Sequence, residues 1–200
     1  MRAFTQMWDE LCESRYGVDD PKLRRFRYGV QVNSLGLTEA QPENNVQRII
    51  LEALGATLSK RARARSIQLP AWNEALGLPK PWDQQWSLRM QQVLALETDL
   101  LEHDDIFDGS HVIEGRTAEL VRDAETELAE VIELGGAFAA IGELKNRLVA
   151  SNTERVRQIE AGELTVVGVN AFQETAQSPL GGDGSFLKVD PRVGSEMIED

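Results

Sequence analysis

The segment Ala62–Pro79, ARARSIQLPAWNEALGLP, decides how the rest of the chain is interpreted. It begins with a short alternating stretch, which is typical of a strand, and continues into a loop bounded by two prolines. The loop contains Trp72, Asn73 and Glu74, which a loop can present to a ligand. A helix is expected from about Pro81, because proline favours the first turn of a helix. Strand, loop and helix in this order form the repeating unit of an α/β barrel.

Composition limits the classes of function that the chain can have. Its 200 residues carry a formal net charge of −12, which argues against nucleic acid as the main partner. Cys12 is the only cysteine, so a disulfide framework and a cysteine-type zinc site are excluded. No apolar run approaches the roughly 20 residues of a membrane span, and the N-terminus lacks the apolar part of a signal peptide. We expect a cytoplasmic protein without a membrane partner.

Residues 24–33 alternate between polar and apolar side chains, which predicts a strand with one face of each kind. The polar face includes Gln31 and Asn33, which stand directly before a long loop. In a barrel, polar residues near the C-terminal end of a strand usually belong to a site. The alternative is an edge strand with a solvated polar side.

Two helices flank this strand in the prediction. Residues 2–16 and residues 43–58 each place apolar side chains at steps of three and four, as an amphipathic helix does. Asn44 and Asn45 fall in the first turn of the second helix, where they could cap the helix or contact a ligand.

A cluster of basic residues precedes the strand of the opening segment. It could meet the phosphates of a nucleotide-like ligand, or it could simply be the solvated start of a strand. Its members are Lys60, Arg61, Arg63 and Arg65.

The helix over 81–97 has many large apolar residues, and we expect them in the core rather than in a cofactor site. They are Trp82, Trp86, Met90, Val93, Leu94 and Leu96. Gln91 and Glu97 are its polar exceptions. A carboxylate at the C-terminus of a helix opposes the helix dipole, which favours a functional role for Glu97.

Residues 99–110 form an acidic loop in which a metal site is conceivable but disfavoured, because the spacing does not match an EF-hand. The residues that suggest a metal are His103, Asp104, Asp105 and Asp108. His111–Glu114 is predicted to be a short last strand.

After Arg116 the pattern changes to long helices over about 116–134 and 138–159, interrupted at a pair of glycines. Residues 166–169 are predicted to form a short strand, and residues 174–200 a linker or frayed end. The chain has no recognisable nucleophile–base–acid triad and no glycine-rich phosphate loop. The residues alone therefore predict an α/β, barrel-like part followed by a helical extension.

Four separated motifs, in order, resemble the adenosylcobalamin-dependent acyl-CoA mutases, that is, the methylmalonyl-CoA mutase family. They are Leu37–Asn45 (LTEAQPENN), Asn73–Pro79 (NEALGLP), Leu134–Gly136 (LGG) and Val166–Asn170 (VVGVN). Three further segments look most like the ethylmalonyl-CoA mutase branch: Phe26–Asn33, Gln68–Trp72 and Asp105–Ser110. Many relatives have His-Thr-Asn and Asp-Pro-x-Gly-Gly-Ser segments where this chain has Gln68–Pro70 and Asp105–Ser110, departures that weaken methylmalonyl-CoA as the substrate.

The resemblance implies an α/β fold that is the C-terminal portion of a TIM (β/α)8 barrel, followed by a helical linker extension. The implied domains are residues 1–115 for about strands six to eight, residues 116–172 for the helical extension and short strand, and residues 173–200 for a flexible linker. A separate domain with an Asp-x-His-x-x-Gly motif would bind the cobalamin, and neither His103 nor His111 stands in that motif. We therefore expect a fragment, a truncated reading frame or one piece of a split enzyme, inactive alone and exposing unpaired sheet edges.

The resemblance also implies site residues. Arg27, Gln31, Asn33 and Gln68 would contact the acyl-CoA substrate. The residues expected to meet the adenosyl group or corrin of adenosylcobalamin are Gln91, Glu97, Asp105 and Glu114. For each of these, a buried structural hydrogen bond is the alternative interpretation. No catalytic residue and no protein metal ligand is assigned.

The implied activity is a radical carbon-skeleton isomerisation, with ethylmalonyl-CoA converted to methylsuccinyl-CoA. Its partners would be the acyl-CoA, the remaining barrel strands and a cobalamin-binding domain, and the family is usually dimeric. One alternative is the methylmalonyl-CoA to succinyl-CoA reaction. Another is a non-catalytic interaction module in which the two long helices bind a partner protein.

Overall fold

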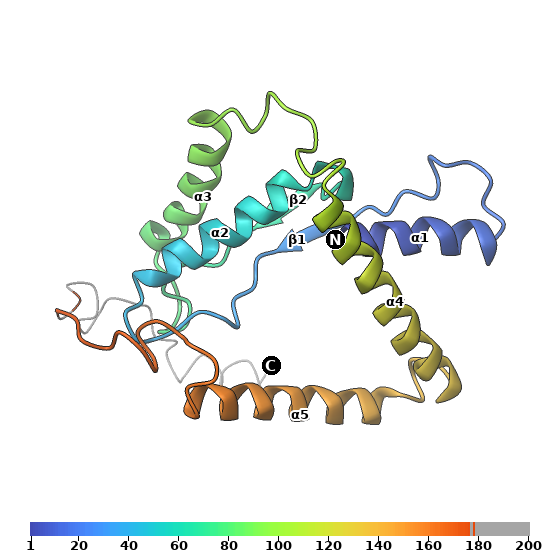
Figure 1. Cartoon of the computed structure of the whole chain (residues 1–200). Coiled ribbons are helices and arrows are strands. Elements are labelled where there is room, and N and C mark those ends of the chain that lie inside the picture. The colour runs from blue at the N-terminus through green and yellow to red at the C-terminus, as the bar shows by residue number, and fades with distance from the viewer. Residues whose placement is uncertain (177, 179–200) are drawn as a thin grey trace, which may run out of the picture. The chain divides into compact units, whose positions relative to one another are not determined.

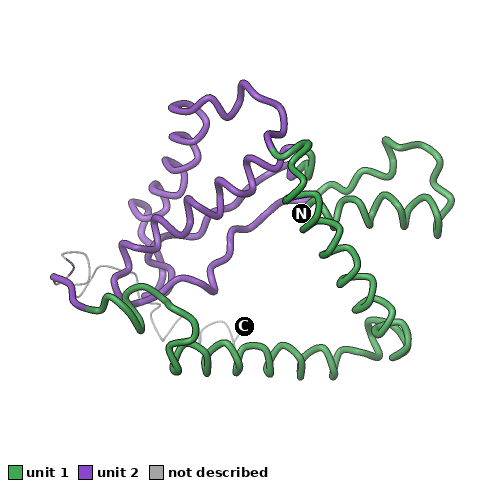
Figure 2. Tube along the Cα trace, viewed as in Figure 1, with its two compact units in different colours: residues 1–27, 61–63, 107–173 green, residues 28–60, 64–106, 174–200 purple. Residues whose placement is uncertain are grey.

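The computed structural model describes residues 1–176 and 178. The elements run along the chain (Figure 1) as α1 (Arg2–Ser14), β1 (Gly29–Gln31), α2 (Asn44–Leu58), a 3-10 turn η1 (Lys60–Ala62), β2 (Ser66–Gln68), α3 (Pro81–Leu96), α4 (His111–Glu133) and α5 (Ile141–Glu160). They form two compact units (Figure 2). Unit 1 holds residues 1–27, 61–63 and 107–173, and unit 2 holds residues 28–60, 64–106 and the described residues after 173.

Unit 2 contains a β–α–β unit, in which β1 and β2 pair in parallel and α2 connects them. The register places Gly29 opposite Ser66 and Gln31 opposite Gln68. The predicted alternation of residues 24–33 is confirmed, although only three of those residues join the ladder. Parallel strands joined by a helix confirm the α/β class.

The core of unit 2 lies between the strands and the helices α2 and α3. One face of the strands turns its apolar residues toward the helices, because side chains alternate along a strand. The helix stripe predicted for residues 43–58 is confirmed, with Ile49 and Ala53 fully buried. The buried cluster is Val32, Ile49, Ala53, Leu69, Trp72, Met90 and Leu94.

The face that α3 buries differs from the prediction. Met90 and Leu94 are in the core as expected, but Trp82 is 49% exposed and Trp86 39% exposed. Val93 and Leu96 are exposed as well. Two polar residues, Asp83 and Ser87, occupy the buried face in their place.

Local hydrogen bonds explain this orientation of α3. The Asp83 carboxylate accepts the backbone N–H of Lys80 at 2.8 Å, and the Ser87 hydroxyl donates to the carbonyl of Pro70 at 2.8 Å. Asp83, Ser87, Met90 and Leu94 are spaced by three or four residues and so share one helix face. The tryptophans fall beside that face and contact each other edge to face, with ring centroids 5.8 Å apart.

Unit 1 contains α1, α4 and α5. Helix α1 packs against α4, and Phe26 lies edge-on to Phe4 with ring centroids 4.6 Å apart. The predicted strand at His111–Glu114 is wrong, because those residues form the first turn of α4. The hydroxyl of Ser110 caps that turn by accepting the N–H of Ile113. The predicted domain boundary at residue 115 therefore falls inside a helix.

Two glycines directly after α4 end that helix. Gly135 and Gly136 have φ values of 95° and 90°, a left-handed conformation that ends α4 as predicted. Residues 166–169 are not the predicted strand: they form a turn, with a single bridge between Val167 and Ala171. The side chain of Asn170 holds this turn by accepting the N–H of Val166 and donating to the carbonyls of Ile159 and Leu164.

Two further predictions from the sequence concern the C-terminal residues and membrane-spanning helices. The predicted linker over 173–200 lies outside the described residues, except for residues 173–176 and 178. Within the part of the chain that the structure describes, no helix combines the length and the apolar character needed to cross a bilayer.

Candidate functional site

Two amide side chains lie side by side on the strand pair of unit 2. Gln31 and Gln68 are register partners on adjacent strands, and both are exposed. Adjacent strands are about 4.8 Å apart, so the two side chains leave the sheet next to each other. Because Val32 and Leu69 face the helices, Gln31 and Gln68 lie on the opposite face of the sheet. The structure thus brings together two of the four predicted substrate-binding residues.

At the start of the strands the same face carries two small residues, Gly29 and Ser66. A Cβ atom at Gly29 would lie 2.6 Å from the hydroxyl oxygen of Ser66, which is closer than real Cβ contacts allow. The absence of a side chain at Gly29 therefore leaves room for the hydroxyl of Ser66, its partner on the adjacent strand. The face runs from small side chains at the strand starts to paired amides at the strand ends.

Asn33 also lies on this side of the chain, but its groups are partly used locally. Its side-chain oxygen accepts the N–H of Leu35 at 2.9 Å, forming an Asx turn. Its backbone N–H donates to the Glu52 carboxylate of α2 at 2.9 Å. Arg27, the fourth predicted substrate residue, is exposed and belongs to unit 1.

A buried asparagine holds the loops that follow the two strands. The Asn45 side chain is fully buried; its oxygen accepts the N–H of Thr38 at 3.0 Å, and its NH₂ group donates to the carbonyls of Thr38 and Trp72 at 2.9 Å. Asn45 does not cap α2, because its side chain instead joins the loop after β1 to the loop after β2. Asn44 instead donates to the side chain of Gln41.

The loop after β2 does not present all three residues that the sequence suggested. Trp72 and Asn73 are only 3% and 1% exposed, and only Glu74 is exposed. Among the described residues, neither the indole N–H of Trp72 nor the side-chain oxygen of Asn73 has a hydrogen-bond partner. Burial in the core of unit 2 explains why Trp72 is turned inward.

The residues expected to meet the cofactor differ in exposure and in the element that carries them. Gln91 and Glu97 lie in and just after α3, which covers the apolar face of the strands, opposite to Gln31. The Gln91 amide donates back along the helix to the carbonyl of Ser87 at 3.5 Å, and Glu97 is exposed. Asp105 is buried, at 7% exposure.

Glu114, the fourth of these residues, belongs to unit 1 rather than unit 2. Its carboxylate accepts the N–H of Gly109 at 3.2 Å. Three of the four residues predicted to meet the cofactor thus belong to unit 2, and Glu114 belongs to unit 1. The structure describes no group of three or more His, Cys, Asp and Glu side chains placed to hold a metal ion.

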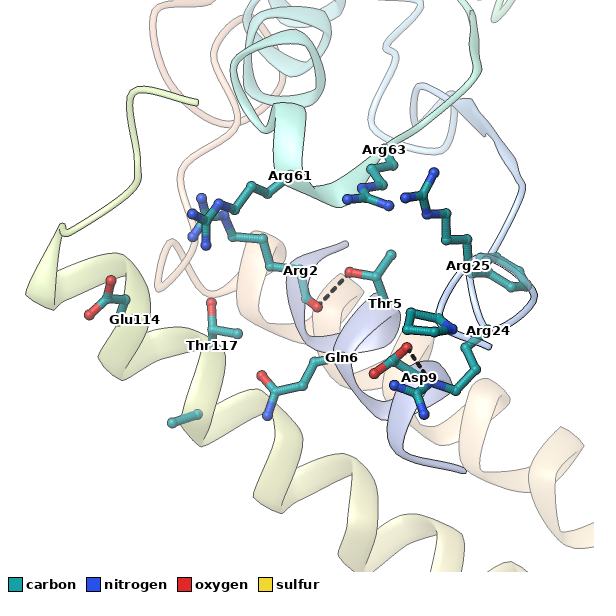
Figure 3. A pocket seen from close by; sticks show the side chains of 13 residues that line it. Arg2, Thr5, Gln6, Asp9, Arg24, Arg25, Arg61, Arg63, Glu114 and Thr117 are labelled. Carbon is teal, nitrogen blue, oxygen red and sulfur yellow. Dashed lines mark hydrogen bonds and ion pairs between the residues drawn. The ribbon is translucent and has the colours of Figure 1, made fainter. Parts of the chain in front are cut away.

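Unit 1 contains a cavity of about 720 Å³, which the sequence predicted only in part. Five arginines line it (Figure 3): Arg2, Arg24, Arg25, Arg61 and Arg63. Arg61 and Arg63 come from the predicted basic cluster, whereas Lys60 and Arg65 belong to unit 2. The other three arginines are far from that cluster in sequence, so only the folded chain shows that they converge.

One of these arginines, Arg24, forms ion pairs with two acidic side chains. Desolvation opposes the charge of Arg24, but hydrogen bonds to Glu13 and Asp9 outweigh it and raise the pKa of the guanidinium. Arg24 therefore serves the structure of unit 1 by tying the loop after α1 to α1 itself.

Comparisons with known proteins give one consistent family. The family model described as methylmalonyl-CoA mutase matches residues 1–200. The ethylmalonyl-CoA mutases of Cereibacter sphaeroides and Methylorubrum extorquens are 60% and 62% identical over 199 residues, covering 99% and 98% of this chain. The methylmalonyl-CoA mutase of Escherichia coli is 33% identical over 175 residues, covering 86% of the chain. The chain spans 30%, 29% and 24% of the lengths of these three relatives.

Proposed function

This chain belongs to the methylmalonyl-CoA mutase family, and on that premise we propose that it is part of a coenzyme-B12-dependent acyl-CoA mutase. The proposed reaction is the carbon-skeleton isomerisation of ethylmalonyl-CoA to methylsuccinyl-CoA. Adenosylcobalamin, which the family implies, would supply the radical chemistry of that reaction. The chain by itself is proposed to be inactive.

The observation that carries the choice of substrate is the difference between two levels of identity. The chain is 60% and 62% identical to two ethylmalonyl-CoA mutases, but 33% identical to the methylmalonyl-CoA mutase of Escherichia coli. Methylmalonyl-CoA, giving succinyl-CoA, is the alternative substrate.

The strand pair of unit 2 supports a place in a TIM barrel. In such a barrel parallel strands alternate with helices, the helices cover the outside, and the opposite face of the strands points inward. Here the helix-covered face is apolar and the opposite face carries Gln31 and Gln68. We propose that these two amides, with Asn33 and Arg27, face the acyl-CoA, where amide groups can hydrogen-bond its carbonyl and carboxylate oxygens.

The same strand pair supports a need for further strands. Two strands of three residues each are marginal alone, and their outer edges carry backbone groups without a neighbouring strand among the described residues. We propose that the other barrel strands and a cobalamin-binding domain complete the enzyme, and that the assembly is cytoplasmic and dimeric. Residues 1–115 would belong to the barrel and residues 116–172 to a helical extension.

A non-catalytic interaction module is the second candidate. Helices α4 and α5 favour it, because they leave several apolar side chains exposed, including Leu148 at 71% and Phe138 just before α5 at 93%. In that case the strand pair would have only a structural role, and the helices would bind a partner protein.

A segment exchange tests the function directly. The matching 199-residue segment of the Cereibacter sphaeroides ethylmalonyl-CoA mutase is replaced by this chain, and the hybrid is assayed with adenosylcobalamin. We expect conversion of ethylmalonyl-CoA to methylsuccinyl-CoA, with a lower kcat/KM for methylmalonyl-CoA. A folded hybrid that converts neither substrate would favour the interaction module, and one that prefers methylmalonyl-CoA would reverse the choice of substrate.

Substitutions in the same hybrid test the strand face. Gln31→Ala and Gln68→Ala should lower kcat/KM strongly while leaving the melting temperature almost unchanged, because both side chains are exposed. Gln47→Ala, on the exposed side of α2, is the matched control and should change neither quantity. Equal activity of all three variants would contradict the role proposed for this face.

A second set of substitutions in the hybrid tests the residues predicted to meet the cofactor. Gln91→Ala and Glu97→Ala should lower turnover of the hybrid far more than its melting temperature if these residues meet the cofactor. Gln85→Ala, an exposed residue on α3, is the control. Parallel losses of turnover and stability would show that Gln91 and Glu97 are structural.

A further inference from the structure

The arginine-lined cavity of unit 1 has an uneven distribution of ion pairs. Arg2 and Arg61 each bind one oxygen of the same carboxylate, Asp108, at 2.7 Å. Arg24 is paired with Asp9 at 3.1 Å and with Glu13 at 2.6 Å. These three guanidinium groups therefore have acidic partners within unit 1.

Arg25 and Arg63 differ from the other three. Among the residues that the structure describes, neither has an ion-pair or hydrogen-bond partner, and both are exposed at the cavity. Figure 3 shows their guanidinium groups pointing toward one another from the loop after α1 and the segment after η1. Like charges that converge repel each other, and an anion bound between them would relieve that repulsion.

The backbone of Arg63 supplies an independent observation. Its φ is 56°, in the left-handed region that non-glycine residues adopt only occasionally. Residues held in such conformations cost free energy and are concentrated at ligand-binding sites. With this left-handed conformation, the long cationic side chain of Arg63 lines the cavity.

The size and walls of the cavity limit the ligand. A volume of about 720 Å³ lies within the range of small-molecule sites and is much larger than a single phosphate needs. Pro21, Phe26 and Ala118 add apolar wall to the polar side chains of α1 and α4. An occupant would thus combine an anionic group with an organic body.

We propose that this cavity binds a phosphate-bearing ligand of nucleotide size, with Arg25 and Arg63 holding its phosphates. Guanidinium groups present two parallel N–H donors that match phosphate oxygens, which lysine does not do. The apolar wall beside Phe26 would take the base or sugar. The cavity is made of residues other than those of the strand face, so this proposal does not depend on the acyl-CoA mutase function.

Calorimetric titration of the full 200-residue chain with ADP and with inorganic pyrophosphate tests the proposal. We expect saturable binding of ADP that weakens as the salt concentration rises. Arg25→Gln and Arg63→Asn should each weaken binding by roughly tenfold to a hundredfold, the loss typical of one charged hydrogen-bond partner. Asparagine tolerates the left-handed conformation, so Arg63→Asn removes the charge without disturbing the backbone.

Two controls keep the result interpretable. Arg122→Gln removes an exposed arginine of α4 outside the cavity and should leave the affinity unchanged. Arg25→Lys keeps the charge but not the paired donors, and should give an intermediate affinity with unchanged circular dichroism. Binding of pyrophosphate as tight as that of ADP would assign the site to an inorganic ligand. Absence of saturable binding of both probes, or equal affinities in all variants, would overturn the proposal.

Discussion

The strand pair with its helices in unit 2 and the helices α4 and α5 in unit 1 are stabilised in different ways. Unit 2 has a continuous buried cluster that includes residues from both strand ends and from α2 and α3. Helix α4 has one buried residue, Val121, and α5 has none. Helices α4 and α5 are instead joined by exposed ion pairs from Arg147 of α5 to Glu127 and Glu130 of α4, and Arg147 also pairs with Glu143 within α5.

This difference shows where single substitutions should matter. Burial of apolar surface is worth far more per side chain than an exposed ion pair, which typically contributes less than about 1 kcal/mol. Unit 2 should therefore respond strongly to loss of volume or of buried hydrogen bonds. Helices α4 and α5 should respond mainly to helix propensity, and the end of α5 also to the protonation of Glu154 and Glu163.

The largest expected effect comes from removing a core side chain. Ile49→Ala should lower the free energy of unfolding by about 2–5 kcal/mol, because the side chain is fully buried and leaves a cavity. Ile132→Ala, at a residue of α4 that is 53% exposed, should change it by no more than about 0.5 kcal/mol. Urea unfolding followed by circular dichroism measures both, and similar losses would break the contrast between the two regions.

The next effect comes from a buried hydrogen-bond donor and acceptor. Asn45→Ala should cost about 2 kcal/mol or more, because it leaves the N–H of Thr38 and two loop carbonyls without their partner. Asn44→Ala removes only a bond to the side chain of Gln41 and should cost about 0.5 kcal/mol. Equal unfolding free energies for the two variants would mean that water replaces Asn45 in its loops.

Two glycine substitutions of opposite sign sharpen the comparison. Gly29→Ala should destabilise unit 2 by about 1 kcal/mol, because the new Cβ would meet the hydroxyl of Ser66 at 2.6 Å. Gly115→Ala lies inside α4 with no atom within 4 Å, and should stabilise the chain by about 0.5–1 kcal/mol through higher helix propensity. Thermal unfolding of the two variants should show shifts in opposite directions.

The smallest effect is a pH dependence at the end of α5. Hydrogen bonds to Arg157 lower the pKa values of Glu154 and Glu163, so both acids are more easily ionised when the helix is folded. The resulting stabilisation is present above the ordinary glutamate pKa of about 4.3 and is lost as the pH falls through the lowered values. Amide exchange of the last turn of α5, followed by NMR, should speed up relative to the first turn on acidification.

Arg157→Gln provides the control for that measurement. It removes the cation that both glutamates share, so the pH dependence of the last turn should disappear. A variant with the same acid response as the original chain would show that the ion pairs do not stabilise this end of α5.

The helices and strands whose apolar residues recur with a clear period were predictable from the sequence. The apolar stripe of α2 and the alternation around β1 each match a single element, and the pair Gly135 and Gly136 ends α4 as expected. His111–Glu114 was misassigned because four residues are too few to show a period. The capping serine just before them was the available signal for a helix.

The remaining errors have a common physical cause, which is competition from polar side chains. Val166–Val169 is apolar enough for a strand, but the Asn170 side chain bonds the backbone on both sides and holds a turn. On α3, Asp83 and Ser87 are buried because backbone groups need them as partners, and the tryptophans are displaced toward solvent.

The candidate sites were predictable to different degrees. Alternation alone puts Gln31 and Asn33 on a polar strand face, but the pairing of Gln31 with Gln68 depends on the register between two strands far apart in sequence. The arginine cavity draws on α1, the loop after it, η1 with the residue that follows it, and α4. Convergence of that kind depends on tertiary packing and has no signature in local sequence.

The Asn45 side chain also has a consequence for motion. It bonds the loop that follows β1 and the loop that follows β2, so the two loops share one mechanical link rather than moving separately. Opening either loop would break bonds to the other and expose a buried amide, which raises the free energy of that fluctuation. Glu74 and the ends of both strands should therefore fluctuate as a single cooperative body, with amide exchange in the two loops rising together.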